Sequence, residues 1–326
     1  MNKVQVIGTG SYAPSRIVTN QDLSLIVDTS DEWISSRTGI GERRISEGED
    51  TSVMATKAAI KAIERSNIKS EDIDLIIVAT ITPDCFTPAT ACIVQNNINA
   101  VNATCFDISA ACSGFVYGLD IATQFIRTGA ANIVLVVGAE TLSKIIDWKD
   151  RSTCVLFGDG AGAAVLRSSD REGILSIYNG SEGNKGHALT CSAVPVNNPY
   201  VLEKNTNILF KDKVHMDGRE VFKFAVRTII HGIETLLKGA KCSLEDIKYI
   251  VPHQANYRII EAAAKRLCVN EEKFYINLDK YGNTSSASIA IALDEMVEKK
   301  LLQKGDKILL IGFGGGLTYG GVIIEW

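Results

Sequence analysis

An internal repeat constrains the fold of this 326-residue chain more than any other feature of its sequence. The triplet Glu71-Asp72-Ile73 recurs as Glu245-Asp246-Ile247, 174 positions later. The apolar segment Val134–Gly138 recurs as Ile308–Gly312 at the same offset. Repeated units of this size bury their apolar faces against one another. The repeat therefore predicts two pseudo-equivalent halves, residues 1–170 and residues 171–326.

The 174-residue offset also carries Cys112 to Ser286. Both residues lie in runs of small side chains that lead into an expected helix. The segments Asp74–Thr80 and Asn132–Gly138 are continuously apolar, which is typical of strands in a sheet that is covered on both faces. We therefore expect an α/β protein in which the two helices that follow the small-residue runs are packed between two sheets.

Composition excludes several classes of protein. A formal net charge of −4 argues against a general nucleic-acid-binding protein. No apolar run approaches the length of a membrane span, and the amino terminus does not have the pattern of a signal peptide. The eight cysteines form no Cys-x-x-Cys pair, so no metal site is expected, and reduced thiols indicate a cytoplasmic protein. The glycines of Gly8-Thr9-Gly10 do not predict a dinucleotide site, because Pro14 follows where a phosphate-binding helix should continue.

Cys112 is a candidate nucleophile. It follows the strand-like segment Thr104–Ile108 and precedes a helix that Gly129 closes, and the small residues 110–114 leave room for a substrate. The first backbone N–H groups of a helix have no intrahelical partner, and the helix dipole favours an anion there. This position therefore predicts a thiol of lowered pKa. A buried structural cysteine is the alternative that the local pattern leaves open.

Two polar residues of the second half are expected near Cys112. His253 follows directly on the apolar strand Tyr249–Val251, and Asn283 precedes an expected helix. Ligand sites of α/β folds lie at the ends of strands, and two packed halves bring the ends of their strands close together at one place. A lone histidine is usually structural and Gly-Asn is usually a turn. Their matching places in a repeated fold nevertheless favour one shared site for Cys112, His253 and Asn283.

Six motifs together carry a resemblance to a known family. In chain order they are Ala110-Ala111-Cys112-Ser113-Gly114-Phe115, Phe157-Gly158-Asp159-Gly160-Ala161-Gly162, Met216-Asp217-Gly218-Arg219-Glu220-Val221-Phe222, Pro252-His253-Gln254-Ala255-Asn256, Gly282-Asn283-Thr284-Ser285 and Gly312-Phe313-Gly314-Gly315-Gly316. Over its whole length the chain closely resembles β-ketoacyl-acyl-carrier-protein synthase III, a thiolase-fold condensing enzyme that starts fatty-acid synthesis. The resemblance implies a thiolase-like fold in which two βαβαβαββ halves form a five-layered αβαβα sandwich.

The resemblance also implies a reaction. Cys112 takes the acyl group of a short acyl-CoA, with acetyl-CoA as the first expectation, and becomes a thioester. Malonyl-acyl-carrier protein then loses CO₂, and its carbanion attacks the thioester to give 3-ketoacyl-acyl-carrier protein. Coenzyme A is a substrate here, and no cofactor or metal is implied. His253 and Asn283 would stabilise the enolate as neutral donors, and the backbone N–H groups of Cys112 and Gly315 would form the oxyanion hole for the acyl carbonyl.

Binding residues are implied in the same way. Trp33 and Arg151 would sandwich the adenine of coenzyme A, and Arg37 would hold its nucleotide phosphates. Phe157 and Phe222 would shape the tunnel to the sulfur and exclude water from it. The complete set implied for coenzyme A and the tunnel is Trp33, Arg37, Thr38, Arg151, Leu156, Phe157, Met216, Gly218, Val221, Phe222, Ala255, Asn256 and Phe313.

The implied partners are acyl-CoA, the acyl carrier protein and a second copy of the chain. The acidic carrier protein is expected to dock on the basic residues Lys223, Arg258, Lys265 and Arg266, for which a solvated helix face is the alternative. Phe86 matches a residue that, in relatives, reaches across a homodimer to cap the partner's acyl pocket. Its bulky ring favours short primers.

Other functions are weighed against this resemblance. Hydroxymethylglutaryl-CoA synthase needs a glutamate near the end of the second strand, where this chain has Ala79-Thr80-Ile81-Thr82. Biosynthetic thiolases carry a second cysteine in the glycine-rich loop, and elongating synthases carry a histidine in place of Asn283. A related ketosynthase of secondary metabolism and an acyl-CoA thioesterase stay open. A non-catalytic carrier-protein-binding module does not need Cys112, His253 and Asn283 together.

Overall fold

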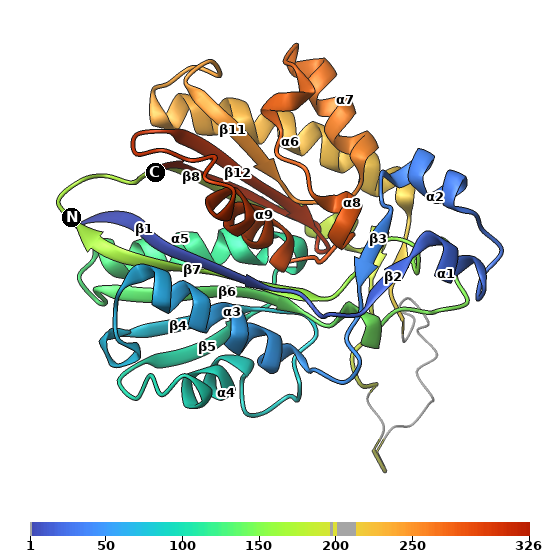
Figure 1. The fold of residues 1–326 in the computed structure, drawn as a ribbon, viewed down its shortest axis with the longest axis horizontal. Coiled ribbons are helices and arrows are strands. Elements are labelled where there is room, and N and C mark those ends of the chain that lie inside the picture. Colours follow the sequence, from blue (N-terminus) through green and yellow to red (C-terminus); the bar gives the residue numbers. More distant parts are fainter. Residues whose placement is uncertain (1, 196–197, 201–212) are drawn as a thin grey trace.

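Two β-sheets with a pair of helices between them organise the molecule (Figure 1). The computed structural model describes residues 2–195, 198–200 and 213–326. The first sheet has the strand order β1-β7-β6-β4-β5, and the second has the order β11-β12-β13-β8. The strands of the first sheet are β1 (Lys3–Tyr12), β4 (Leu75–Ala79), β5 (Thr104–Ile108), β6 (Ile133–Glu140) and β7 (Gly160–Ser169). Those of the second are β8 (Ile174–Ser181), β11 (Ile247–Pro252), β12 (Lys307–Gly314) and β13 (Thr318–Glu325).

Helices cover both sheets, and five layers result (Figure 1). Helices α3 (Thr51–Ser66) and α4 (Thr90–Asn97) lie on the outer face of the first sheet. Helices α5 (Gly114–Arg127) and α9 (Ala287–Glu298) form the middle layer, and α6 (Gly218–Ala240) and α7 (Tyr257–Leu267) cover the second sheet. The predicted αβαβα sandwich is confirmed.

The offset read from the sequence locates equivalent elements. Strand β6 begins at Ile133 and β12 begins at Lys307, 174 residues later. Helix α9 likewise occupies the place of α5 in the second half. The halves differ at one strand: where an equivalent of β5 is expected, Phe274 forms only an isolated bridge with Ile250. All nine strands of the two sheets fall within residues 3–169 or 174–325, and the boundary between residues 170 and 171 stays a prediction.

Helix α5 is built for the middle layer. Phe115, Leu119, Ala122 and Ile126 recur at helical spacing and are all fully buried. This spacing is typical of a helix with one apolar face, and the burial of all four residues shows that this face is the packed one. Because α5 contacts strands of both sheets, its amino terminus is held at the boundary between the two halves.

The glycines near the amino terminus serve packing. A β-carbon at Gly8 would lie 2.6 Å from the carbonyl oxygen of Ala62, and one at Gly10 would lie 2.3 Å from that of Ala58. Both glycines therefore let α3 approach β1 closely.

Smaller elements frame one end of the molecule (Figure 1). They are β2 (Ile17–Thr19), α1 (Asn20–Ser24), α2 (Asp31–Thr38), β3 (Glu42–Arg44), β9 (Leu189–Thr190), β10 (His215–Met216) and α8 (Leu278–Tyr281). Within the described residues, every helix is too short or too polar to span a bilayer.

Candidate active site

Cys112 lies on a 3₁₀ turn, Ala111–Ser113, immediately before α5. Its predicted place at the strand-to-helix junction is confirmed. Ala111 has a φ of 46°, a left-handed conformation that side chains disfavour and that turns the chain sharply before the cysteine. Gly314 lies against this turn: a β-carbon there would be 2.7 Å from the backbone nitrogen of Cys112. Only glycine permits this approach of β12 to the nucleophile.

The thiol of Cys112 is 6% exposed, and this burial raises its pKa to about 12. The expectation that the helix terminus lowers this pKa is wrong. Loss of hydration penalises the thiolate more than the local hydrogen bonds to Ser285 and the backbone favour it. The resting residue is thus a neutral thiol, and its proton has to leave as the sulfur attacks.

A cavity of about 130 Å³, the inner cavity, brings the three candidate residues together. Cys112, His253 and Asn283 all line it, and His253 and Asn283 are 1% and 7% exposed. His253 follows β11, and Asn283 follows α8. The two halves of the chain therefore supply one dry site, as the sequence predicted for these residues.

The ring of His253 has a defined hydrogen-bonding state. Burial lowers the pKa of this imidazole to about 3, so the ring is neutral. Its Nδ1 atom lies 2.7 Å from the hydroxyl oxygen of Ser288, which accepts the backbone N–H of Gln254 at 3.4 Å. The Ser288 hydroxyl can donate its hydrogen to Nδ1, and in that tautomer the ring proton is on Nε2. His253 can accordingly present a neutral N–H donor.

The carboxamide of Asn283 is oriented by its own loop. The backbone N–H of Ser285 donates to Asn283 Oδ1 at 2.8 Å. The backbone of Asn283 is held in addition by Leu156 and Gly158, through hydrogen bonds of 2.8 Å and 3.0 Å. With its oxygen occupied, the side chain offers its NH₂ group as a donor. The site thus holds two neutral donors, from His253 and Asn283.

The predicted tunnel residues surround this cavity. Nine of the residues that line it were expected: Leu156, Phe157, Met216, Gly218, Val221, Phe222, Ala255, Asn256 and Phe313. Five further lining residues were not expected: Leu189, Phe224, Ile259, Gly314 and Leu317. Leu156, Met216 and Phe222 also line a second, outer cavity of about 650 Å³, together with Trp33, Arg37 and Thr38. The two cavities share these walls, so the outer cavity beside α2 adjoins the inner cavity that contains the sulfur.

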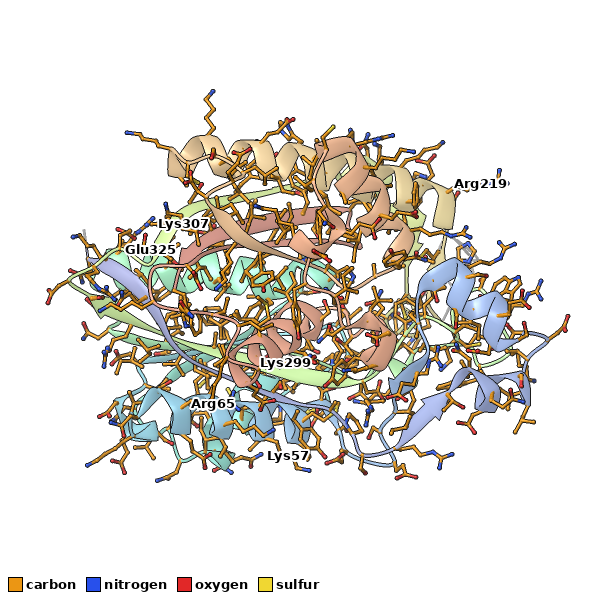
Figure 2. The ribbon with its side chains drawn as sticks, turned by 45° about the horizontal axis from the view of Figure 1, so that its top comes forward. Lys57, Arg65, Arg219, Lys299, Lys307 and Glu325 are labelled. Carbon is orange, nitrogen blue, oxygen red and sulfur yellow. The ribbon has the colours of Figure 1, made fainter. Side chains whose placement is uncertain are left out.

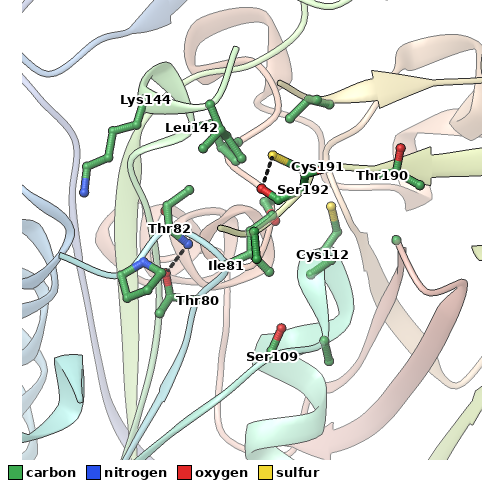
Figure 3. A pocket seen from close by; sticks show the side chains of 18 of the residues that line it. Thr80, Ile81, Thr82, Ser109, Cys112, Leu142, Lys144, Thr190, Cys191 and Ser192 are labelled. Carbon is green, nitrogen blue, oxygen red and sulfur yellow. Dashed lines mark hydrogen bonds between the residues drawn. The ribbon is translucent and has the colours of Figure 1, made fainter. Parts of the chain in front are cut away.

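Cys112 also lines a third, distal cavity of about 1130 Å³ (Figure 3). Cys112, Ile81, Leu142 and Cys191 line it (Figure 3). Phe86 of the same chain lines it as well and is 80% exposed. Gly315 also borders this cavity, whereas its neighbour Gly314 borders the inner one. Cys112 therefore borders both the inner cavity and the larger distal cavity.

Arg37 and Arg151 both lie over the indole of Trp33. Their guanidinium carbons are 4.9 Å and 5.1 Å from the ring centroid. Arg151 also donates to the backbone carbonyl of Asp28 at 2.7 Å. The predicted adenine sandwich between Trp33 and Arg151 consequently needs Arg151 to swing away from the ring, because the two groups are already in contact.

The four predicted docking residues do not all lie together. Lys223 and Arg258 line the outer cavity, whereas Lys265 and Arg266 belong to the last turn of α7. Arg219 joins the first pair at the outer cavity and was not predicted; it projects from the first turn of α6 (Figure 2). It belongs to a motif that the sequence singled out, but no periodic signal distinguishes it from a solvated residue. Ser285 and Ser288 were missed too, because a run of small residues does not reveal which hydroxyl faces the site.

Comparison with known proteins decides the family. A model of "3-Oxoacyl-[acyl-carrier-protein (ACP)] synthase III" matches residues 106–183, and the model of its C-terminal part matches residues 237–326. A β-ketoacyl-[acyl-carrier-protein] synthase III of Clostridium kluyveri is 66% identical over 325 residues, which cover 100% of this chain and 99% of that protein. This chain belongs to the β-ketoacyl-acyl-carrier-protein synthase III family. It is an acyltransferase of the condensing-enzyme type.

Solved structures of synthase III proteins have the same fold. The 3-oxoacyl-[acyl-carrier-protein] synthase III of Aquifex aeolicus superposes with a TM-score of 0.92 at 47% identity, covering 99% of this chain and 100% of that one. A priming β-ketosynthase of the R1128 polyketide pathway superposes with the same TM-score of 0.92 at 38% identity, covering 99% and 96% of the two chains. The chain therefore shares its architecture with a synthase III and with a polyketide-priming ketosynthase.

Proposed function

We propose that this enzyme starts type II fatty-acid synthesis by a decarboxylative Claisen condensation. Cys112 attacks a short acyl-CoA, acetyl-CoA first, and the thiol proton ends on the departing coenzyme A thiol. Malonyl-acyl-carrier protein then loses CO₂, and the resulting carbanion attacks the Cys112 thioester. The products are 3-ketoacyl-acyl-carrier protein, coenzyme A and CO₂, and no resident cofactor or metal takes part.

One observation carries the division of roles. His253 and Asn283 are both neutral and both have their acceptor atoms occupied, by Ser288 and by the Ser285 backbone. Two neutral donors stabilise a developing enolate oxygen without the charge repulsion that a carboxylate would add. The backbone N–H groups of Cys112 and Gly315 are proposed to bind the acyl carbonyl oxygen.

The outer cavity is proposed to bind coenzyme A and the phosphopantetheine arm of the carrier protein in turn. Trp33, Arg37 and Arg151 are the proposed contacts to the nucleotide. Lys223 and Arg258, with Arg219 added, are the docking residues that the outer cavity favours most. Lys265 and Arg266 would extend the contact along α7.

A homodimer is proposed as the working form. Strand β5 is an edge strand of the first sheet, and the ring of Phe86 is exposed beside the distal cavity of its own chain. In a dimer this ring would close the partner's acyl pocket and restrict it to short primers. We propose the cytoplasm as the compartment, in keeping with the exposed thiols of Cys85, Cys92 and Cys268, which a reducing environment preserves.

The decisive assay offers a panel of acyl-CoAs with malonyl-acyl-carrier protein and detects products by mass spectrometry. Acetyl-CoA is expected to give 3-ketoacyl-acyl-carrier protein faster than branched or longer primers. Release of coenzyme A without a new carbon–carbon bond would instead identify a thioesterase. The similarity to a polyketide-priming ketosynthase favours a second candidate, a ketosynthase of secondary metabolism, and a strong preference for another primer would support it.

A further inference from the structure

Glu140, the last residue of β6, is a fully buried carboxyl group that the proposed chemistry does not use. Its Oε2 atom accepts hydrogen bonds of 2.7–3.2 Å from two hydroxyls and one backbone N–H of residues 80–82, a segment visible in Figure 3. These donors follow β4 and fix the carboxyl group within the first half of the chain. Its other oxygen, Oε1, faces Ser285 and Ser286 of the second half.

Ser285 connects Glu140 to Asn283. The hydroxyl of Ser285 donates to Glu140 Oε1 at 3.2 Å, and the backbone N–H of the same residue donates to Asn283 Oδ1 at 2.8 Å. Ser285 has a φ of 49°, in the left-handed region that side chains disfavour. A residue in this conformation needs surrounding contacts that hold it there. The carboxyl group therefore holds the residue whose N–H orients the carboxamide.

Ser286 brings the same loop against the first half. Its single hydroxyl hydrogen has two acceptors within reach, the carbonyl oxygen of Ala79 at 2.8 Å and Glu140 Oε1 at 3.0 Å. The hydrogen serves one of them at a time, and either bond ties the loop to the first half. A β-carbon at Gly138 would lie 2.4 Å from the carbonyl oxygen of Ser286, so only glycine lets β6 approach the loop this closely. The ends of β4 and β6 thus hold the loop between Asn283 and α9 by direct contact.

We propose that Glu140 is a positioning residue for Asn283: it holds the hydroxyl of Ser285, and the backbone N–H of Ser285 keeps the carboxamide turned so that its NH₂ group can donate to the enolate oxygen. No proton is transferred to or from Glu140. The first half of the chain thereby sets the orientation of a donor that belongs to the second half. The inference rests on the proposed role of Asn283 in malonyl decarboxylation and adds the group that orients this residue.

The test measures CO₂ release from malonyl-acyl-carrier protein and acylation of Cys112 by acetyl-CoA as two separate rates. Glu140→Met removes both acceptor oxygens, and Ser285→Ala removes the hydroxyl while keeping the N–H that Asn283 accepts. Each variant should lower CO₂ release about tenfold and leave acylation within about twofold. A misoriented donor should cost less than the factor of about 10²–10³ that is lost with an oxyanion donor itself.

Two further variants separate the contact from a general effect on folding. In Glu140→Gln the amide oxygen can accept from residues 80–82 while the NH₂ group donates to the hydroxyl oxygen of Ser285, so CO₂ release should return to within about threefold of the unchanged chain. Asp294→Leu is the matched control. Asp294 is another fully buried carboxyl group between the halves, and it accepts from two hydroxyls of β1 at 2.8 Å and 2.7 Å. It lines none of the three cavities, so its removal should not change the ratio of the two rates.

A double variant shows whether Glu140 acts through Asn283. In the Asn283→Ala background, Glu140→Met should lower CO₂ release no further, because the carboxamide that it orients is gone. A further loss of similar size in that background, an equal loss of both rates in Glu140→Met, or no recovery in Glu140→Gln would each overturn the inference. Ser285→Ala takes the place of Glu140→Met in these comparisons if that variant fails to fold.

Failure of this inference and failure of the proposed function remain distinguishable. An unchanged chain that releases no CO₂ from malonyl-acyl-carrier protein would overturn the proposed function, and this inference with it. An unchanged chain that releases CO₂ no faster than folded Glu140→Met and Ser285→Ala would overturn this inference alone.

Discussion

The Nδ1 atom of His253 lies 2.7 Å from the hydroxyl oxygen of Ser288. The Ser288 hydroxyl, which accepts the Gln254 N–H, can donate its own hydrogen to Nδ1, and in that tautomer the ring proton is on Nε2. Supporting groups of this kind keep a site residue in one tautomer and one orientation. Without Ser288, the imidazole could place its proton on Nδ1 and present an acceptor to the substrate.

Ser288→Ala should therefore lower the rate of malonyl decarboxylation about tenfold, less than the loss of the donor itself. Acylation of Cys112 by acetyl-CoA should be unchanged. The two steps are measured separately, as CO₂ release and as acyl-enzyme mass. Ser66→Ala serves as the control, and an unchanged decarboxylation rate in Ser288→Ala would remove the argument for the Nε2 donor.

Asn283→Ala should leave acylation by acetyl-CoA within about twofold and lower decarboxylation by about 10²–10³, the usual effect of losing one oxyanion donor. The reason is that Asn283 offers an NH₂ group whose oxygen is already bound to the Ser285 N–H. Asn179→Ala, which removes a similar carboxamide on β8, is the control. Equal loss of both steps in Asn283→Ala would contradict the division of roles.

Cys112→Ala should abolish the covalent acyl-enzyme that acetyl-CoA forms with the unchanged chain. Cys105 is the matched control: burial raises its pKa to about 12, as it does for Cys112, but the residue lies on β5 and lines none of the three cavities. Cys105→Ala should retain full acylation. Intact-protein mass spectrometry decides the point, and acylated protein in Cys112→Ala would refute the assignment.

The sequence predicted the fold because its signals repeat. The 174-residue offset located β12 from β6, and the spacing of Phe115, Leu119 and Ile126 located the buried face of α5. Strand lengths were less predictable: β1 continues through Gly8 and Gly10 to Tyr12, because these glycines pack against α3 inside the strand. Tertiary packing, which a single sequence does not show, decided that boundary.

The site was predictable only in its reacting residues. Cys112, His253 and Asn283 lie where an expected strand ends or an expected helix begins. Ser285 and Ser288, in contrast, are two hydroxyls in a run of small residues with no periodic signal. The pKa of Cys112 was misjudged for a physical reason. A helix terminus stabilises the thiolate locally, but the depth of burial depends on β12 and Gly314, which are some 200 residues away along the chain. Long-range packing therefore determines the charge state of the Cys112 thiol, which the local sequence could not predict.

The buried neutral ring of His253 makes stability depend on pH. Its pKa is lowered from 6.5 to about 3, so between these values the unfolded chain binds a proton that the folded chain does not. The free energy of unfolding should rise with pH across this window, and the contribution is fully present above pH 6.5. At pH 5 the histidine should lower the free energy of unfolding by about 2 kcal/mol relative to pH 7.5.

Urea unfolding at the two pH values tests this prediction. The contribution of His253 is the difference in pH dependence between the unchanged chain and His253→Gln, which cannot titrate at this position. Buried carboxyls such as Glu140 and Asp159 are present in both proteins and cancel. The same pH dependence in His253→Gln as in the unchanged chain would mean that the ring is not held neutral.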